Sequence, residues 1–156
     1  MIITKPKVQI EKDVQDFLKA FSKINEANFH FKILSLFPKY CCEFTSMLLA
    51  RFLIEEKGYK ITDVLMIKGQ CRKNPSQLHL WLDVLGIKVD LTSGQFEDAP
   101  KIIIAEYHYW HDHFQIVDIY LPEINFESYL GDYEERALEY DYMQIIKQIN
   151  GNLMAF

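Results

Sequence analysis

Apolar residues recur at helical spacing along the first third of the chain. They begin at Val8 and run to Ile24, and from Ile10 on their steps of three and four predict an amphipathic helix. A second pattern of this kind, over residues 41–57, predicts a helix that begins near residues 40–42 and ends at Gly58, because glycine tolerates the left-handed backbone that terminates helices. Residues 29–37, which lie between them, are apolar but irregular, and we expect a short helix or a turn there.

After Gly58 the helical spacing gives way to short stretches that alternate or are rich in β-branched residues. They predict strands joined by short turns, over residues 61–67, 78–84, 87–91, 102–105 and 114–121. Residues 133–150 predict a closing helix that ends before Gly151. No repeat, low-complexity tract or linker divides the chain, so we expect residues 1–156 to form one α+β domain, with the helices packed on an antiparallel sheet.

Composition narrows the classes of function. Hydrophobic residues make up 49% of the 156 residues and charged residues 25%, which is typical of a soluble globular protein. The net charge of −5 and a thin basic cluster at residues 68–73 argue against a nucleic-acid partner, which would need gathered Lys and Arg side chains. No apolar run approaches the roughly 20 residues of a membrane span. We expect a cytoplasmic protein, although secretion by a route without a signal would leave no mark in the sequence.

The chain has three cysteines, and one of them is placed where a thiol can be activated. Cys41 and Cys42 stand side by side at the expected start of the second helix, and Cys71 is remote from them in sequence. The free backbone N–H groups at a helix start stabilise a thiolate, which is the species that attacks a carbonyl. The same N–H groups can bind the oxyanion that follows from the attack. Taken alone, however, a cysteine is more often a buried space-filling residue.

A histidine and an aspartate fall on two adjacent predicted strands. In residues 78–84, His79 shares one face of the strand with Trp81, and the other face is apolar and expected to meet the core. A tight turn at residues 85–86 would make a hairpin in which Asp90 is the diagonal neighbour of His79, within reach of side-chain contact. A carboxylate there can hold the imidazole in the tautomer that a thiol needs. Asp83 lies beside the turn, and we interpret it as an ordinary strand carboxylate.

In this order, with Cys at a helix start and His and Asp on successive strands, the chain resembles the papain-like and transglutaminase-like superfamily of cysteine enzymes. Residues 38–53 are similar to the segment P-x-G-C/S-C-G-x-x-S-x-x-L-x-x-x-L of some small uncharacterised bacterial members. Residues 77–96 are similar to their segment H-x-W-x-x-V-x-G-x-x-x-D-x-T-x-x-Q-F, which here reads His79, Trp81, Val84, Gly86, Asp90, Thr92, Gln95 and Phe96.

The resemblance implies a Cys-His-Asp triad in which Cys42 is the nucleophile, His79 the base and Asp90 the residue that orients the base, with no cofactor and no metal. Two residues depart from the family segment: Tyr40 stands where Gly is common, and Glu43 follows the nucleophile where a small residue is common. A carboxylate beside a thiolate opposes its ionisation unless it points away, and Cys41 therefore remains a rival nucleophile.

Other polar groups have weaker interpretations. Asn28, Gln70 and Gln95 are candidates for a side-chain amide in an oxyanion hole. The histidines of residues 107–113 lack the spacing of a zinc site, and we expect a wet aromatic loop, which could line a substrate groove. Acidic residues on the closing helix, namely Glu134, Glu135, Glu139 and Asp141, are typical of a solvated face.

The sequence therefore predicts a cysteine-dependent amide or peptide hydrolase, or an acyl transferase, acting on a peptide, protein or small amide. The alternative is a non-catalytic interaction module that keeps the same fold. The sequence leaves the substrate, the choice between hydrolysis and transfer, and the oligomeric state open.

Overall fold

The computed structural model describes residues 6–126 and 132–154. Its helical part contains α1 (Lys7–Ser22), α2 (Cys42–Lys57) and α3 (Asp132–Met154). Its strands are β1 (Val64–Cys71), β2 (Leu78–Val84), β3 (Ile87–Asp90), β4 (Ile103–Ala105) and β5 (Phe114–Tyr120). Short 3-10 helices connect these elements: η1 (Glu26–Asn28), η2 (Lys32–Leu36), η3 (Ile61–Asp63), η4 (Ser93–Gln95) and η5 (Tyr109–His113).

The five strands form one antiparallel sheet in the order β4-β3-β2-β1-β5. The β2–β3 hairpin has the predicted register, with Val84 opposite Ile87. Its turn residues, Leu85 and Gly86, both have positive φ angles, 51° and 87°. This is the geometry that two-residue hairpin turns require. The prediction of an α+β fold with an antiparallel sheet is confirmed.

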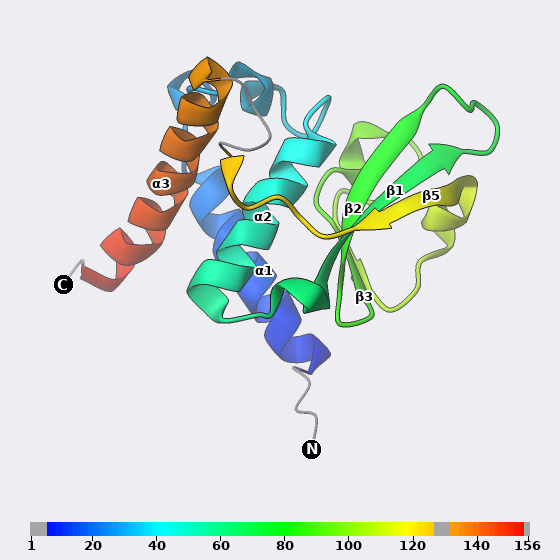
Figure 1. Ribbon diagram of the computed structural model, residues 1–156, viewed down its shortest axis with the longest axis horizontal. Coiled ribbons are helices and arrows are strands. Elements are labelled where there is room, and N and C mark those ends of the chain that lie inside the picture. Colours follow the sequence, from blue (N-terminus) through cyan, green and yellow to red (C-terminus); the bar gives the residue numbers. More distant parts are fainter. Residues whose placement is uncertain (1–5, 127–131, 155–156) are drawn as a thin grey trace.

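The helices gather on one side of the sheet (Figure 1), where α2 packs on β2 and β1 while α1 packs on α2 and α3. The main core lies between these layers, and its members include Phe17, Leu48, Phe52, Leu82 and Ile145. Most of the apolar positions that gave α1 and α2 their helical pattern point into this core, but Val8 is exposed. Burial of these side chains, each contributing roughly 1.5–3 kcal/mol, fixes the helices against the sheet.

A second, smaller core lies on the opposite face of the sheet, where the sequence predicts a less apolar surface. It consists of Ile67, Trp81, Ile103, Trp110 and Phe114. The segment that contains η5 covers this face, and its residue Trp110 is 2% exposed. The expectation of a wet aromatic loop at residues 107–113 is therefore wrong for its central residues. The physical reason is that Trp110 and His111 of η5 pack on Phe114 and Trp81 of the sheet, whereas the rings of Tyr107 and Tyr109 remain exposed.

Several predicted boundaries shift. β1 begins at Val64, because residues 61–63 form η3, and it continues to Cys71 because both β2 and β5 pair with it. The closing helix continues through Gly151 to Met154, since one glycine costs a helix only about 1 kcal/mol. Leu78 is 47% exposed, although the alternation predicted that it faces the core.

The acidic residues of α3 are not all on a solvated face. Asp141 is fully buried and accepts hydrogen bonds from the backbone N–H groups of His30 and Phe31, at 2.8 and 2.7 Å. Glu139 forms a two-pronged ion pair with Arg51 of α2. Both contacts join α3 to distant parts of the chain. The side chains of Glu134 and Glu135 lie outside the described residues.

Candidate functional site

Cys41 and Cys42 differ sharply in their surroundings. Cys42 is the first residue of α2 and is half-buried, whereas Cys41 precedes the helix and is fully buried. The Thr45 hydroxyl lies 3.4 Å from the Cys41 sulfur, and burial raises the pKa of the Cys41 thiol. A buried thiol that resists ionisation is a poor nucleophile. The geometry therefore favours Cys42 over Cys41 as the reactive residue.

The residue before this pair has an unusual backbone conformation. Tyr40 has a φ of 63°, in the left-handed region that costs a non-glycine residue roughly 1–2 kcal/mol. Its side chain is 76% exposed, so packing does not compensate for this cost. A glycine at this position would adopt the same backbone without this cost.

His79 and Asp90 meet as the hairpin register predicts. The His79 Nε2 atom is 2.8 Å from the Asp90 Oδ2 atom, and both side chains are fully buried. The backbone N–H of Thr92 donates to the other carboxylate oxygen, Oδ1, at 3.1 Å. Since a carboxylate only accepts, the His79 Nε2 atom carries the hydrogen, and the Nδ1 atom is left to exchange a proton.

His79 occupies an aromatic enclosure on the second core, not the surface position that the strand pattern predicts. The rings of Trp81, Phe96, Trp110 and Phe114 surround it at centroid distances of 5.2 to 5.8 Å. These rings exclude water from the imidazole, and its interactions with charged groups are correspondingly strong.

The electrostatics of this pair reflect a competition between burial and charge. Burial lowers the pKa of His79, but the charge and hydrogen bond of Asp90, together with those of Cys42, outweigh it and raise the pKa to about 9. Burial likewise raises the pKa of Asp90, while His79 and His111 outweigh it and lower the pKa to about 2. The carboxylate and the imidazolium are thus both charged at neutral pH. The hydrogen bond and the charge of Cys42 are the last two of the causes that raise the pKa of His79, after those of Asp90.

Glu43 follows Cys42 in α2 and is half-buried. The pKa of the Tyr120 phenol, at the end of β5, is raised to about 12. Burial is the largest cause of this rise, and the charge of Glu43 is the second. Cys42 also contributes to this rise. The end of β5 therefore lies beside the first turn of α2.

Sequence reasoning missed one member of the site. His111, from η5, is 5% exposed, and its Nε2 atom is 2.7 Å from Asp90 Oδ2, the same oxygen that binds His79. The sequence predicted only a wet aromatic loop around His111. No local signal in the sequence pairs residue 111 with residue 90, because the contact depends on how the η5 segment folds back over the sheet.

The three amide candidates for an oxyanion hole separate clearly. The Gln95 Nε2 atom is 3.1 Å from the His79 Nδ1 atom, so this amide belongs to the site. The Gln70 amide instead donates to the backbone oxygen of Pro75 at 2.8 Å. Asn28 is an exposed residue of η1 whose backbone oxygen accepts from Gln144. Asp83 accepts from the Gly86 N–H at 2.9 Å and supports the hairpin turn, as expected for an ordinary strand carboxylate.

The histidines of residues 108–113 have separate partners. The His108 Nδ1 atom accepts from the Trp110 N–H at 3.1 Å, and the His113 Nδ1 atom is 2.8 Å from the Trp110 backbone oxygen. Within the described part of the chain, no three His, Cys, Asp or Glu side chains have an arrangement that could hold a metal ion. None of the helices over the described residues is long and apolar enough for a membrane span.

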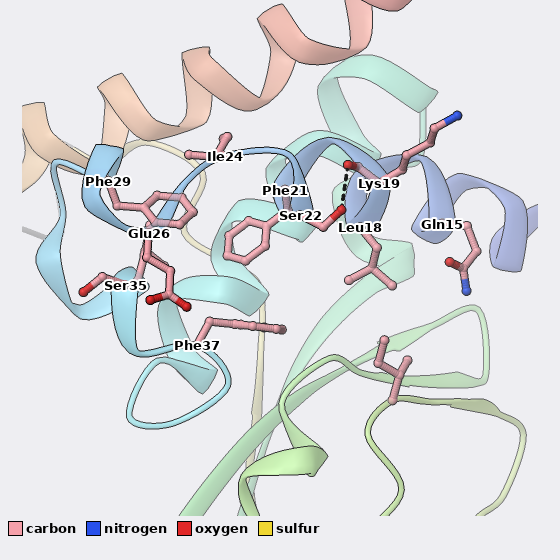
Figure 2. Close-up of a pocket in the computed structure, with 12 residues that line it drawn as sticks. Gln15, Leu18, Lys19, Phe21, Ser22, Ile24, Glu26, Phe29, Ser35 and Phe37 are labelled. Carbon is pink, nitrogen blue, oxygen red and sulfur yellow. Dashed lines mark hydrogen bonds between the residues drawn. The ribbon is translucent and has the colours of Figure 1, made fainter.

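A hollow of about 450 Å³ lies between α1, the η1–η2 segment and Ile102 (Figure 2). Most of its lining is apolar, and Phe37 is the lining residue nearest in sequence to Cys42. Ile102 precedes Ile103, which pairs with Asp90 in the sheet. Cys42, His79 and Asp90 do not line this hollow. The hollow therefore adjoins the candidate site along the chain but is not part of it.

Comparisons with protein-family models, with curated proteins and with solved structures found no match.

Proposed function

We propose that the chain is a cysteine-dependent amide or peptide hydrolase, or an acyl transferase, whose nucleophile is Cys42, whose base is His79 and whose orienting residue is Asp90. One observation carries the proposal. The buried His79 imidazole binds the buried Asp90 carboxylate at 2.8 Å, and Cys42, on the first turn of α2, follows Asp90 among the causes that raise the pKa of this imidazole. The three residues come from α2, β2 and β3. They supply the thiol, the imidazole and the carboxylate that thiol catalysis requires, with the imidazole between the other two groups.

The charge states support a resting ion pair. Because the pKa of His79 is raised to about 9, the imidazole carries a proton at neutral pH and can stabilise a thiolate at Cys42. The N–H groups of the first turn of α2 add to this stabilisation. In the proposed reaction the sulfur attacks the substrate carbonyl carbon, and the carbonyl π electrons move to its oxygen.

The tetrahedral adduct then collapses. The carbon–nitrogen bond of an amide, or the carbon–sulfur bond of a thioester, breaks while the His79 Nδ1 atom gives its proton to the leaving group. Water or an amine next attacks the carbonyl carbon of the Cys42 thioester, and His79 takes up the proton that this nucleophile loses. The bond between this carbon and the Cys42 sulfur then breaks, which releases the acyl product and restores the thiolate. Water gives hydrolysis and an amine gives transfer. Asp90 keeps the Nε2–H of His79 bound throughout, so that Nδ1 is the only ring atom that exchanges protons with reactants.

The first turn of α2 and Gln95 supply donors for the oxyanion in this proposal. When His79 is neutral, its Nδ1 atom can accept from the Gln95 amide, 3.1 Å away. When His79 is protonated, Nδ1–H and the amide N–H are both donors and cannot bond each other. The amide N–H is then available for the substrate oxygen, which matches the state in which the thiolate attacks.

Thiol reactivity tests the proposal directly. We expect iodoacetamide at neutral pH to alkylate Cys42 at least about tenfold faster than Cys71, the half-buried internal reference on β1. Peptide mapping of the wild type and of the variants Cys42→Ala and Cys41→Ala identifies the labelled residue. The variant His79→Gln should lose the fast phase, because it removes the cation. Acetylation of Cys42 by p-nitrophenyl acetate, detected by mass spectrometry, would demonstrate acyl transfer to the thiol.

The alternative is a non-catalytic interaction module of the same fold. Equal and slow alkylation of Cys42 and Cys71, with no acetylated Cys42, would favour it over the enzyme.

A further inference from the structure

The Asp90 carboxylate binds two imidazoles through one oxygen. His79, from β2, lies 2.8 Å from Oδ2, and His111, from η5, lies 2.7 Å from the same atom. The backbone N–H of Thr92 occupies Oδ1. A buried carboxylate thus has three donors, from three different segments of the chain. The thiol reaction needs only one of them, His79, so the presence of His111 requires its own account.

The hydrogen-bond pattern fixes the state of the His111 ring. Since Asp90 can only accept, the His111 Nε2 atom must carry a hydrogen. The His111 Nδ1 atom is buried and has no hydrogen-bond partner among the described residues. The ring therefore acts on the site through its Nε2–H group.

The position of this ring is set by packing. It stacks on Trp81 with a centroid distance of 4.4 Å and an interplanar angle of 21°. Trp81 in turn lies 5.6 Å from the His79 ring, so one indole contacts both imidazoles. The contact directs the His111 N–H at Asp90 independently of the substrate.

We propose that His111 is a positioning residue of this site: its Nε2–H binds the shared oxygen of Asp90 and holds the carboxylate in the orientation that faces His79. This inference rests on the proposed function, because Asp90 matters for chemistry only if His79 does. His111 touches neither the thiol nor the substrate in this account. It compensates for the burial of Asp90 and keeps the carboxylate ionised, since its hydrogen bond is one of the causes that lower the pKa of Asp90.

Two variants separate the donor from the ring. His111→Phe keeps an aromatic ring against Trp81 and removes the donor, whereas His111→Gln loses the ring and retains an amide N–H at a similar distance from the backbone. The charged and titratable groups that face this centre are His79 and Asp90, with Cys42 acting on His79 from α2. A carbon-13 NMR titration of the Asp90 carboxyl group reports its ionisation directly. Nitrogen-15 shifts of His79 report its tautomer, and neither measurement depends on catalysis.

We expect the proton affinity of the Asp90 carboxylate to rise about tenfold in His111→Phe, because this variant loses a hydrogen bond to a charged group. In His111→Gln the proton affinity should return close to the wild-type value. Iodoacetamide labelling of Cys42 at neutral pH should fall in the first variant and recover in the second. A folded His111→Phe protein in which Asp90 titrates as in the wild type would overturn the inference. Equal changes in both variants would also overturn it, because restoring an N–H donor in His111→Gln would then have had no effect on Asp90.

The two proposals fail separately. If wild-type Cys42 proves unreactive, the enzyme proposal is wrong, while the Asp90 titration still decides whether His111 holds the carboxylate.

Discussion

Replacing Asp90 with asparagine should remove the negative charge that keeps His79 protonated. The variant removes the anion that raises the pKa of His79, while the burial that lowers it remains. We expect the pKa of His79 to fall from about 9 to below its ordinary value of 6.5, so that the imidazole is neutral at pH 7. If the proposed function is right, Cys42 then loses the cation beside its thiol, and its alkylation by iodoacetamide should become slow.

The same change alters stability in a pH-dependent way. The folded pKa of His79 is raised, so its contribution is complete below 6.5 and is lost as the pH rises through about 9. The folded pKa of Asp90 is lowered, so its contribution is present above 3.8 and is lost as the pH falls through about 2. The difference between wild type and variant should therefore be largest between about pH 4 and pH 6.5, and should shrink towards pH 9.

The magnitude follows from the shift. Raising the pKa of a buried histidine from 6.5 to about 9 corresponds to about 3 kcal/mol, at about 1.4 kcal/mol per unit. The Asp90 shift reports the same interaction from the other side and is not added. Asparagine also cannot accept all three hydrogen bonds that the carboxylate accepts. Its NH₂ group, which is a donor, would face either the Thr92 N–H or the two histidine Nε2–H groups. An unmet donor pair adds about 1–3 kcal/mol at every pH.

Urea denaturation between pH 4 and pH 10 measures this difference, and NMR titration of His79 measures the pKa. Asp83→Asn is the matched control, since it makes the same change in net charge on β2 and an asparagine can still accept from the Gly86 N–H. A stability difference between wild type and Asp90→Asn that stays constant from pH 5 to pH 9 would refute the reasoning. A His79 that still titrates near pH 9 in the variant would do so as well.

Two backbone positions give further tests. Because Tyr40 has a φ of 63°, we expect Tyr40→Gly to be more stable than Tyr40→Ala by about 1 kcal/mol in urea denaturation. At Lys12, an exposed position of α1, the alanine variant should instead be more stable than the glycine variant. A glycine variant that is the more stable one at both positions, or at neither, would contradict the φ argument. Gly69→Ala should destabilise by about 1–3 kcal/mol, because the new Cβ atom would lie 2.8 Å from Trp81. Gly151→Ala, which meets open space in α3, is its control, and an equally mild thermal shift in both would count against the steric argument.

The sequence by itself determined the local structure and part of the site. Helical periodicity predicted α1 and α2, and Gly58, which ends α2 with a φ of 76°, was readable as a helix stop. The alternation of residues 78–91 and the turn at Leu85 and Gly86 predicted the register that brings His79 and Asp90 together. These features were predictable because they depend on neighbours within about a dozen residues, where spacing along the chain dictates spacing in space.

Only the tertiary structure decided which groups are buried and which distant segments meet. The pattern could not show that η5 covers the His79 face of the sheet, and so it predicted a less apolar face around His79 and a wet loop around His111. It likewise could not show that Asp141 anchors the backbone of residues 30–31 from more than a hundred residues away. Such contacts depend on how whole elements pack, and a polar residue that a packed element covers has the same local sequence signature as one that solvent covers. Burial in turn sets the pKa values of His79 and Asp90, so the electrostatics of the site follow from packing and not from composition.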